Sequence, residues 1–252
     1  MTLQRLDRQE FLDEFFDYQP GEHLSLIYPT QRGKSHLAWQ LLGRAMEQNP
    51  GLRPVTLMPK ALSPSTHRWA DAYGFDEIPG WPPRRRLFHP RPPGHVVWPL
   101  HRNDLSAAED RAQVAEALRG AMHANFVKGK CILFADDLHL LALMGLMTEC
   151  EEYWTAGAEG GAAIWGANQK PSGTLTGGAV STYFYNAPMH FFLGRDTDGR
   201  NIQRFSEFGG GLDPREIAAI VRNLRLYRIG KKVISEVLYI DARLPAKALI
   251  GP

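Results

Sequence analysis

The chain has 252 residues, of which 44% are hydrophobic and 22% are charged, a composition that is typical of a globular protein and excludes collagen, a disordered tail and a disulfide scaffold. Because 29 Lys and Arg residues are nearly balanced by 27 Asp and Glu residues, any affinity for nucleic acid must come from local patches. The two cysteines have no metal-binding spacing, and no apolar run approaches the roughly 20 residues that span a bilayer. We therefore expect a cytoplasmic protein with a single domain over residues 1–252.

The first half of the chain predicts alternating helices and strands. Residues 1–20 predict a helical lead-in, with an apolar face made by Phe11, Leu12, Phe15 and Phe16. The elements expected next are a strand at 23–28, a helix at 34–48, a strand at 55–58, a short helix at 65–73 and a brief strand at 95–98. A loop rich in Pro and Arg is expected at residues 79–94.

The second half continues the alternation. Ser106 and Glu109 have the spacing of a capping box, which predicts a helix that runs to Val127. The later expected elements are a buried strand at 131–135, a helix at 138–154, strands at 162–166, 189–193 and 236–240, a short helix near 178–183 and a helix that begins after Asp213. This order favours an α/β fold of three layers, αβα, whose mostly parallel sheet binds its ligand at the carboxyl ends of the strands.

The strongest motif is YPTQRGKS at residues 28–35, which follows an apolar strand and opens a helix, as does the phosphate-binding loop G-x-x-x-x-G-K-[ST]. In such a loop the backbone amides surround phosphate, Lys34 reaches the β and γ oxygens, and Ser35 holds Mg²⁺. Tyr28 replaces the first glycine of the pattern, so a solvated turn with a surface lysine is the alternative. The predicted nucleotide-binding residues are Pro29, Thr30, Gln31, Arg32, Gly33, Lys34, Ser35 and His36.

CILFADD at residues 131–137 supplies the second part expected of such a site, an apolar strand that ends in an aspartate. Asp136 is predicted to reach Mg²⁺ through water, so Ser35 and Asp136 are the expected metal residues. Asp137 is predicted to be catalytic, because an acid at this position polarises the attacking water in one large division of these enzymes. Alternatively, both acids cap the following helix.

That division also has an additional strand between the phosphate-loop strand and the aspartate strand. The expected strands at 55–58 and 95–98 both fall in this interval of the sequence. We therefore expect a P-loop NTPase fold of the RecA/ASCE type, with ATP and Mg²⁺ as cofactors.

With these motifs placed, the chain resembles the HerA/FtsK superfamily of P-loop ATPases, motors that pump duplex DNA. The resemblance further rests on residues 166–205. Residues 168–171 (NQKP) are similar to the Thr-Gln-Arg-Pro motif that ends a strand in FtsK-like proteins. Residues 193–195 (LGR) and 198–200 (DGR) are similar to the Phe-Arg strand end and the Asp-x-Arg helix start that follow it.

The resemblance implies roles for three further residues. Gln169 would sense the γ-phosphate, and Arg195 or Arg200 would act as an arginine finger offered to the next subunit, where a planar cation stabilises developing phosphoryl charge. Each arginine could instead form a surface ion pair with Asp196 or Asp198. Gln169 could instead close a turn.

The resemblance also implies a homo-oligomeric ring, a hexamer, that translocates or packages double-stranded DNA. A compact core without appended modules is similar to viral and phage packaging ATPases, which implies host cytoplasm or a virion as its location and a portal, capsid or other protein as partner. The family has glutamate where Asp137 stands. An ATP-dependent assembly or switch protein with slow hydrolysis is therefore the alternative function, and a small-molecule kinase fits less well.

A candidate DNA contact lies in the loop at 79–94. Its basic residues alternate with Trp81 and Phe88 and could follow a phosphate backbone, although a solvated basic loop is the simpler interpretation. The basic residues are Arg84, Arg85, Arg86, His89 and Arg91. The spaced histidines His89, His95 and His101 have no acid or thiol at a ligand spacing, so we expect no metal there.

Overall fold

The computed structural model describes residues 3–29, 31–84, 91–169, 180–208, 213–244 and 246–252. The strands of these residues are β1 (Gln4–Leu6), β2 (Leu24–Ile27), β3 (Arg53–Leu57), β4 (Asp76–Ile78), β5 (His95–Val97), β6 (Cys131–Ala135), β7 (Ala162–Asn168), β8 (His190–Gly194), β9 (Leu226–Ile229), β10 (Lys232–Ser235), β11 (Val237–Asp241) and β12 (Ala246–Ile250). One sheet has the order β1-β12-β11-β8-β2-β7-β6-β3-β5-β4, and β9 and β10 pair separately as a hairpin. All neighbours from β8 to β4 are parallel.

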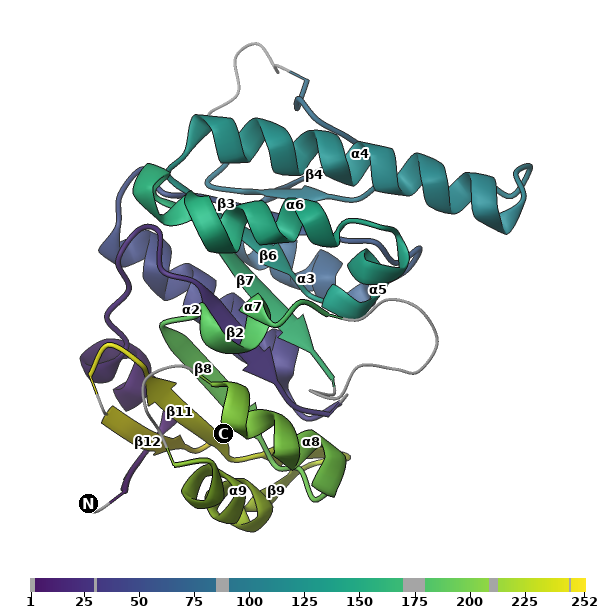
Figure 1. The fold of residues 1–252 in the computed structure, drawn as a ribbon. Coiled ribbons are helices and arrows are strands. Elements are labelled where there is room, and N and C mark those ends of the chain that lie inside the picture. The colour runs from purple at the N-terminus through teal and green to yellow at the C-terminus, as the bar shows by residue number, and fades with distance from the viewer. Residues whose placement is uncertain (1–2, 30, 85–90, 170–179, 209–212, 245) are drawn as a thin grey trace.

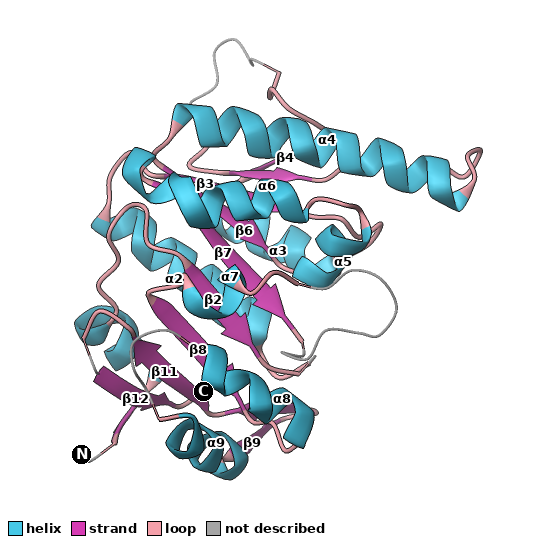
Figure 2. Ribbon diagram, in the orientation of Figure 1, coloured by secondary structure: helices cyan, strands magenta, loops and turns pink. Residues whose placement is uncertain are grey.

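Helices cover both faces of this sheet (Figures 1 and 2). They are α1 (Arg8–Glu10), α2 (Lys34–Gln48), α3 (Pro64–Tyr73), α4 (Ala107–Lys128), α5 (Leu138–Leu143), α6 (Met147–Glu152), α7 (Tyr183–Asn186), α8 (Gly199–Gln203) and α9 (Pro214–Asn223), with π-helical turns at Phe11–Phe15 and Tyr153–Gly157. Among the described residues, no helix has both the length and the apolar character needed to cross a bilayer.

The sheet separates two apolar cores. Leu133 of β6 belongs to the core beneath α4, whereas its neighbours Ile132 and Phe134 belong to the core beneath α2. This alternation follows because successive side chains of a strand point to opposite faces of the sheet. The predicted three-layer αβα fold with a mostly parallel sheet is therefore confirmed.

The strand that separates the phosphate-loop strand β2 from the aspartate strand β6 is β7. The predicted additional strand is thus present, but neither sequence candidate supplies it. Both β3 and β5 lie on the other side of β6. The order of the strands along the chain does not determine their order in the sheet, because the crossover that joins two parallel strands can place the second strand beyond a neighbouring position.

The helix expected at 138–154 is broken. It ends at Leu143, turns through Gly145, whose φ of +73° is a left-handed conformation, and resumes as α6 at Met147. Glycine adopts this conformation without the steric penalty that a Cβ imposes, so the break occurs at the residue best suited to it.

Several short elements were not predicted. Strand β1 adds parallel to β12 in the lead-in region, β4 extends the opposite edge of the sheet, and the hairpin β9–β10 precedes the expected last strand. The short helix expected near 178–183 begins at Tyr183, and residues 178 and 179 lie outside the described residues. The capping box of Ser106 and Glu109 is present at the start of α4.

Tyr28, which replaces the first glycine of the loop pattern, is buried in the core beneath α2. The Tyr28 side chain packs against Gly194, the last residue of β8. A Cβ at Gly194 would lie 2.0 Å from Cβ of Tyr28 and 2.4 Å from its Cγ. The tyrosine fits at the start of the loop because its neighbour on β8 has no side chain.

We predict that Gly194→Ala lowers the free energy of unfolding by about 1–3 kcal/mol, since the added methyl must displace the backbone of β8 or of the loop. The matched control is Gly120→Ala in α4, where a Cβ meets nothing within 4 Å and alanine favours the helix by about 1 kcal/mol. Urea denaturation of both variants measures the difference. A Gly194→Ala variant as stable as the wild type would contradict the close packing.

Candidate active site

The loop between β2 and α2 lies at the carboxyl edge of the sheet. Gly33 has a φ of +93° and stands at the N-cap of α2, where no side chain occupies the first amides of the helix. Free amides at a helix N-terminus favour an anion. Gln31, at the mid-loop position where a glycine is often found, also has a positive φ of +59°, which is uncommon outside glycine and is a form of strain that clusters at functional sites.

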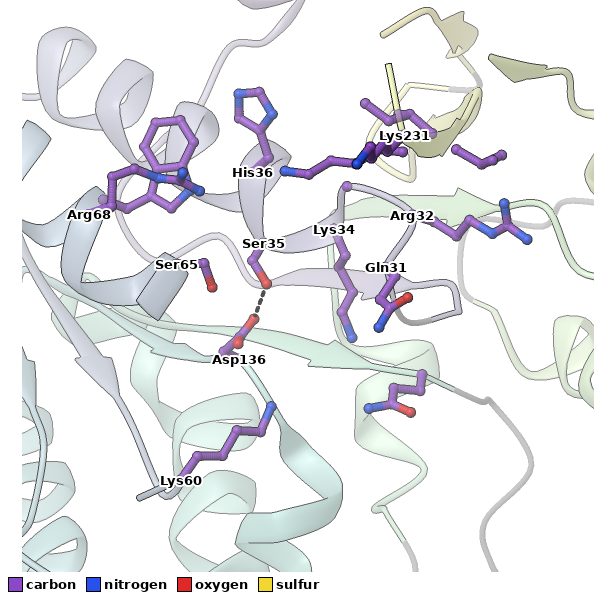
Figure 3. A pocket seen from close by; sticks show the side chains of 16 residues that line it. Gln31, Arg32, Lys34, Ser35, His36, Lys60, Ser65, Arg68, Asp136 and Lys231 are labelled. Carbon is purple, nitrogen blue, oxygen red and sulfur yellow. Dashed lines mark hydrogen bonds between the residues drawn. The ribbon is translucent and has the colours of Figure 1, made fainter. Parts of the chain in front are cut away.

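Ser35 and Asp136, the two residues predicted to hold a metal ion, are in contact with each other. The Ser35 hydroxyl donates a hydrogen bond of 2.9 Å to Oδ1 of Asp136 (Figure 3). The contact joins the first turn of α2 to the end of β6, residues 101 positions apart in the sequence. A hydroxyl oxygen and a carboxylate oxygen, which are atoms of the kind that Mg²⁺ prefers, are therefore side by side.

Lys34 is 9% exposed and lies on the same side of the loop as Gln31 (Figure 3). Burial lowers the pKa of its amine, while the charges of Asp136 and Asp137 act in the opposite direction. Burial likewise raises the pKa of Asp136, against the charges of Lys34 and Lys60. Each charged group therefore compensates part of the other's desolvation.

Asp137 has the position of a helix cap. Its Oδ1 accepts a hydrogen bond from the amide of Leu140 in α5, and its Oδ2 forms an ion pair of 3.0 Å with Nζ of Lys60. Asp137 therefore caps α5, which was the alternative role considered for this acid, and it also forms an ion pair with Lys60. Both oxygens of the Asp137 carboxylate have partners, and Asp137 is not among the residues that line the cavity beside the phosphate loop.

A cavity of about 690 Å³ opens beside the loop. Among the described residues that line it, six are lysines or arginines and Asp136 is the only carboxylate. The six are Arg32, Lys34, Lys60, Arg68, Lys231 and Lys232. A cavity with this excess of cations favours a polyanionic ligand.

The other predicted nucleotide residues are placed as follows. Gln31, Arg32, Gly33, Ser35 and His36 line the cavity, and Pro29 is not among the lining residues. Thr30 lies outside the described residues. The ring of His36 stacks on Trp69, with centroids 4.8 Å apart. Burial lowers the pKa of His36, and the charges of Arg8, Lys232 and Arg68 lower it further.

Gln169 lines the cavity from the end of β7, where its amide donates to Oδ1 of Asn168 at 2.8 Å. This placement results from the register of the sheet, which pairs Asn168 with Ile27 at the last residue of β2. Lys170 and Pro171 of the same motif lie outside the described residues.

The two candidate finger arginines do not line this cavity. Arg195 follows β8, and its amide donates to Oγ of Ser235 at 3.0 Å. Arg200 is in the first turn of α8, where its amide is capped by Asp198 at 2.9 Å. Among the described residues, neither arginine forms an ion pair with Asp196 or Asp198, the alternative considered for them.

The candidate DNA loop is described only in part. Arg85, Arg86, Phe88 and His89 lie outside the described residues, whereas Trp81 packs edge-on against His95. His101 is paired with Asp110 at 2.8 Å. Within the described part of the chain, no group of three or more His, Cys, Asp or Glu residues could hold a metal ion.

Comparison with known proteins identifies the fold. The structure is similar to the DNA-packaging ATPase B204 from Sulfolobus turreted icosahedral virus, with a TM-score of 0.60, 13% identity, and coverage of 93% of this chain and 99% of that chain. It is also similar to the genome packaging NTPase B204 from Sulfolobus turreted icosahedral virus 2 in complex with AMPPCP (TM-score 0.54, 11% identity, 93% and 100% coverage). The chain has the fold of the P-loop ATPases. At these identities the likeness concerns the fold alone.

The P-loop fold is shared beyond viral proteins. A KaiC-like protein from the archaeon Pyrococcus horikoshii OT3 matches with a TM-score of 0.50 and 13% identity, over 98% of this chain and 91% of that chain. No protein-family model matches the sequence, and no curated protein matches it either.

Sequence reasoning missed eight of the described residues that line this cavity, and three of them are Ser65, Val233 and Ile234. The other five are lysines, an arginine and a tryptophan. Lys60 follows β3, Arg68 and Trp69 belong to α3, and Lys231 and Lys232 are at the tip of the β9–β10 hairpin. None belongs to a recognisable motif. The one available signal was the pair of adjacent lysines after Gly230, which is typical of an exposed turn. This pattern does not indicate which part of the fold the turn contacts.

The two contacts of Asp137 predict different effects for two substitutions. Asp137→Ala loses the cap of α5 and the partner of Lys60, and we expect it to lower the free energy of unfolding by about 1–2 kcal/mol. Asp137→Asn keeps a capping oxygen and should stay within about 0.5 kcal/mol of the wild type. Urea denaturation of both variants checks this, and equal losses would show that the cap contributes little.

Proposed function

We propose that this protein is a Mg²⁺-dependent ATPase with one ATPase domain over residues 1–252. The observation that carries the proposal is the hydrogen bond between Ser35 and Asp136 beside the buried amine of Lys34, at the base of a cation-lined cavity. The site combines a helix N-terminus, a lysine and two hard oxygen donors. This combination suits a nucleoside triphosphate better than any other common ligand.

The residues present fit the magnesium ion that this function requires. Ser35 Oγ and Asp136 Oδ1 are already in contact and are oxygen donors of the right chemistry. These two residues would hold the ion, directly or through water. When bound, Mg²⁺ neutralises charge on the β- and γ-phosphate oxygens.

The chain's own residues perform the other functions of the site. The amides of residues 31–36 and the amine of Lys34 bind and orient the phosphates. Gln169, which lines the cavity after the end of β7, contacts the terminal phosphate or the attacking water. Asp137 polarises that water, which requires that its carboxylate leave Lys60. Arg195 or Arg200 acts on the site of a neighbouring subunit, consistent with their positions outside their own cavity.

We further propose that the ATPase is a ring-forming motor of the FtsK/HerA type that translocates or packages double-stranded DNA. Support comes from the NQKP, LGR and DGR motifs and from the similarity to packaging ATPases over 93% of this chain. A hexamer, a viral or phage origin and a portal or capsid partner belong to the same proposal.

A second candidate function is an ATP-dependent assembly switch that acts on a protein partner and hydrolyses slowly. The observation that favours it is the double engagement of Asp137 by α5 and Lys60, because a carboxylate held in this way is a poor base. DNA-stimulated turnover separates the two functions.

The first prediction concerns Lys34. Lys34→Ala should lower the rate of ATP hydrolysis at least about 100-fold, since it removes the cation that opposes charge on the transferring phosphoryl group. The matched control is Lys128→Ala, at the exposed end of α4, which should retain the wild-type rate. A steady-state phosphate-release assay measures both. Unchanged hydrolysis by Lys34→Ala would overturn the ATPase proposal.

The second prediction concerns DNA. Linear duplex DNA should stimulate the wild-type hydrolysis rate, and the stimulation should fall as salt is raised, because backbone contacts release counterions. The same assay with and without duplex, at 50 and 200 mM salt, tests it. Nucleotide binding with slow turnover that ignores DNA would instead support the assembly switch.

A further inference from the structure

The β9–β10 hairpin lies against the phosphate loop, although about 200 residues separate them in the sequence. Its strands pair antiparallel, from Lys232 with Ile229 to Ser235 with Leu226, and its turn contains Gly230, with a φ of +61°, and Lys231. Four consecutive residues from the turn into the second strand, Lys231 to Ile234, line the cavity. The hairpin therefore forms one wall of the nucleotide site in the same chain.

The base of the hairpin is fixed. The amide of Glu236 donates to the carbonyl of Arg225 at 2.8 Å, and the amide of Arg225 donates to Oε2 of Glu236 at 3.0 Å. The Glu236 side chain is 1% exposed, and its Oε1 accepts from Nε of Arg5 at 3.1 Å. A buried carboxylate with both oxygens engaged holds the hairpin in one orientation.

The hairpin also contacts the loop itself. The amide of Ser235 donates to the carbonyl of Arg32 at 3.5 Å, and a Cβ built on Gly33 would lie 3.3 Å from Cγ2 of Ile234. Oγ of Ser235 accepts the amide of Arg195 at the end of β8. Ser235 thus connects the phosphate loop, the hairpin and the strand that precedes a candidate finger arginine.

The two lysines at the tip are exposed and line the cavity. Within the described residues, no carboxylate forms an ion pair with either of them. Lys232 is close enough to His36, in the first turn of α2, for its charge to act on that ring. Two adjacent uncompensated cations over a phosphate-binding loop form a complementary surface for a second portion of a polyanion.

We propose that the β9–β10 hairpin is a phosphate clamp, in which Lys231 and Lys232 bind the terminal phosphates of the nucleotide that the loop of the same chain holds. This inference rests on the proposed function and adds a cation supplied in cis to the arginine expected from a neighbouring subunit.

The test compares nucleotides that differ in phosphate number. The double variant Lys231→Ala/Lys232→Ala and the wild type are titrated with Mg-ATP, ADP and AMP by calorimetry, and with a short DNA duplex. We expect the affinity for ATP to fall at least about tenfold in the variant, with the affinity for AMP unchanged, since charged hydrogen bonds to the outer phosphates are lost.

Two controls make the result specific. Arg228→Ala removes an exposed cation from the same hairpin at a position that does not line the cavity, and it should bind ATP as the wild type does. Lys231→Arg/Lys232→Arg should restore most of the affinity. A double alanine variant that binds ATP like the wild type, or that loses ATP and AMP affinity equally, would overturn the clamp.

Other outcomes separate the clamp from the function on which it rests. Loss of duplex affinity with ATP affinity intact would identify the lysines as a DNA contact and reject the clamp. Failure of the wild type to bind any nucleotide would reject the proposed ATPase together with the clamp. Wild-type ATP binding that the double variant retains rejects the clamp alone.

Discussion

The site depends on keeping opposite charges together away from water. An ammonium or a carboxylate buried alone loses several kcal/mol of hydration, and it neutralises or draws in a partner. For Lys34 and Asp136, burial shifts each pKa toward the neutral form, and the charge of the other residue opposes part of that shift, while Ser35 donates a hydrogen bond to the carboxylate. The arrangement suits a ligand that brings both negative charge and a cation, as a nucleoside triphosphate does with its metal ion.

The parallel sheet supplies this proximity. Strands β2, β7 and β6 are neighbours with their carboxyl ends at one edge, so the phosphate loop, Gln169 and Asp136 arrive at the same place. The register pairs Ile27 with Asn168 and Ala135 with Gly166. A shift of one residue in either pairing would move the side chains to opposite faces. The chemistry therefore depends on the backbone hydrogen bonds of strands that contribute few side chains to the cavity.

Local chemistry explains which features the sequence predicted. The strand, loop and helix around Gly33 lie within 25 residues, and CILFADD combines a buried strand and its acids, so both motifs could be identified without the fold. Lys60, Arg68 and the hairpin lysines reach the cavity from segments whose neighbours in space depend on the sheet order. The strand between β2 and β6 was misassigned for the same reason. Three-residue strands such as β1 and β4 are too short to show a periodicity.

The packing of Tyr28 on Gly194 has a consequence for how this protein can diverge. A tyrosine at position 28 leaves no room for any side chain at position 194, whereas a glycine at position 28, as in the common loop pattern, would remove that restriction. The two positions, 166 residues apart, should therefore change together among related sequences: a relative with glycine at 28 is free to vary at 194, and a relative with an aromatic residue at 28 keeps the glycine.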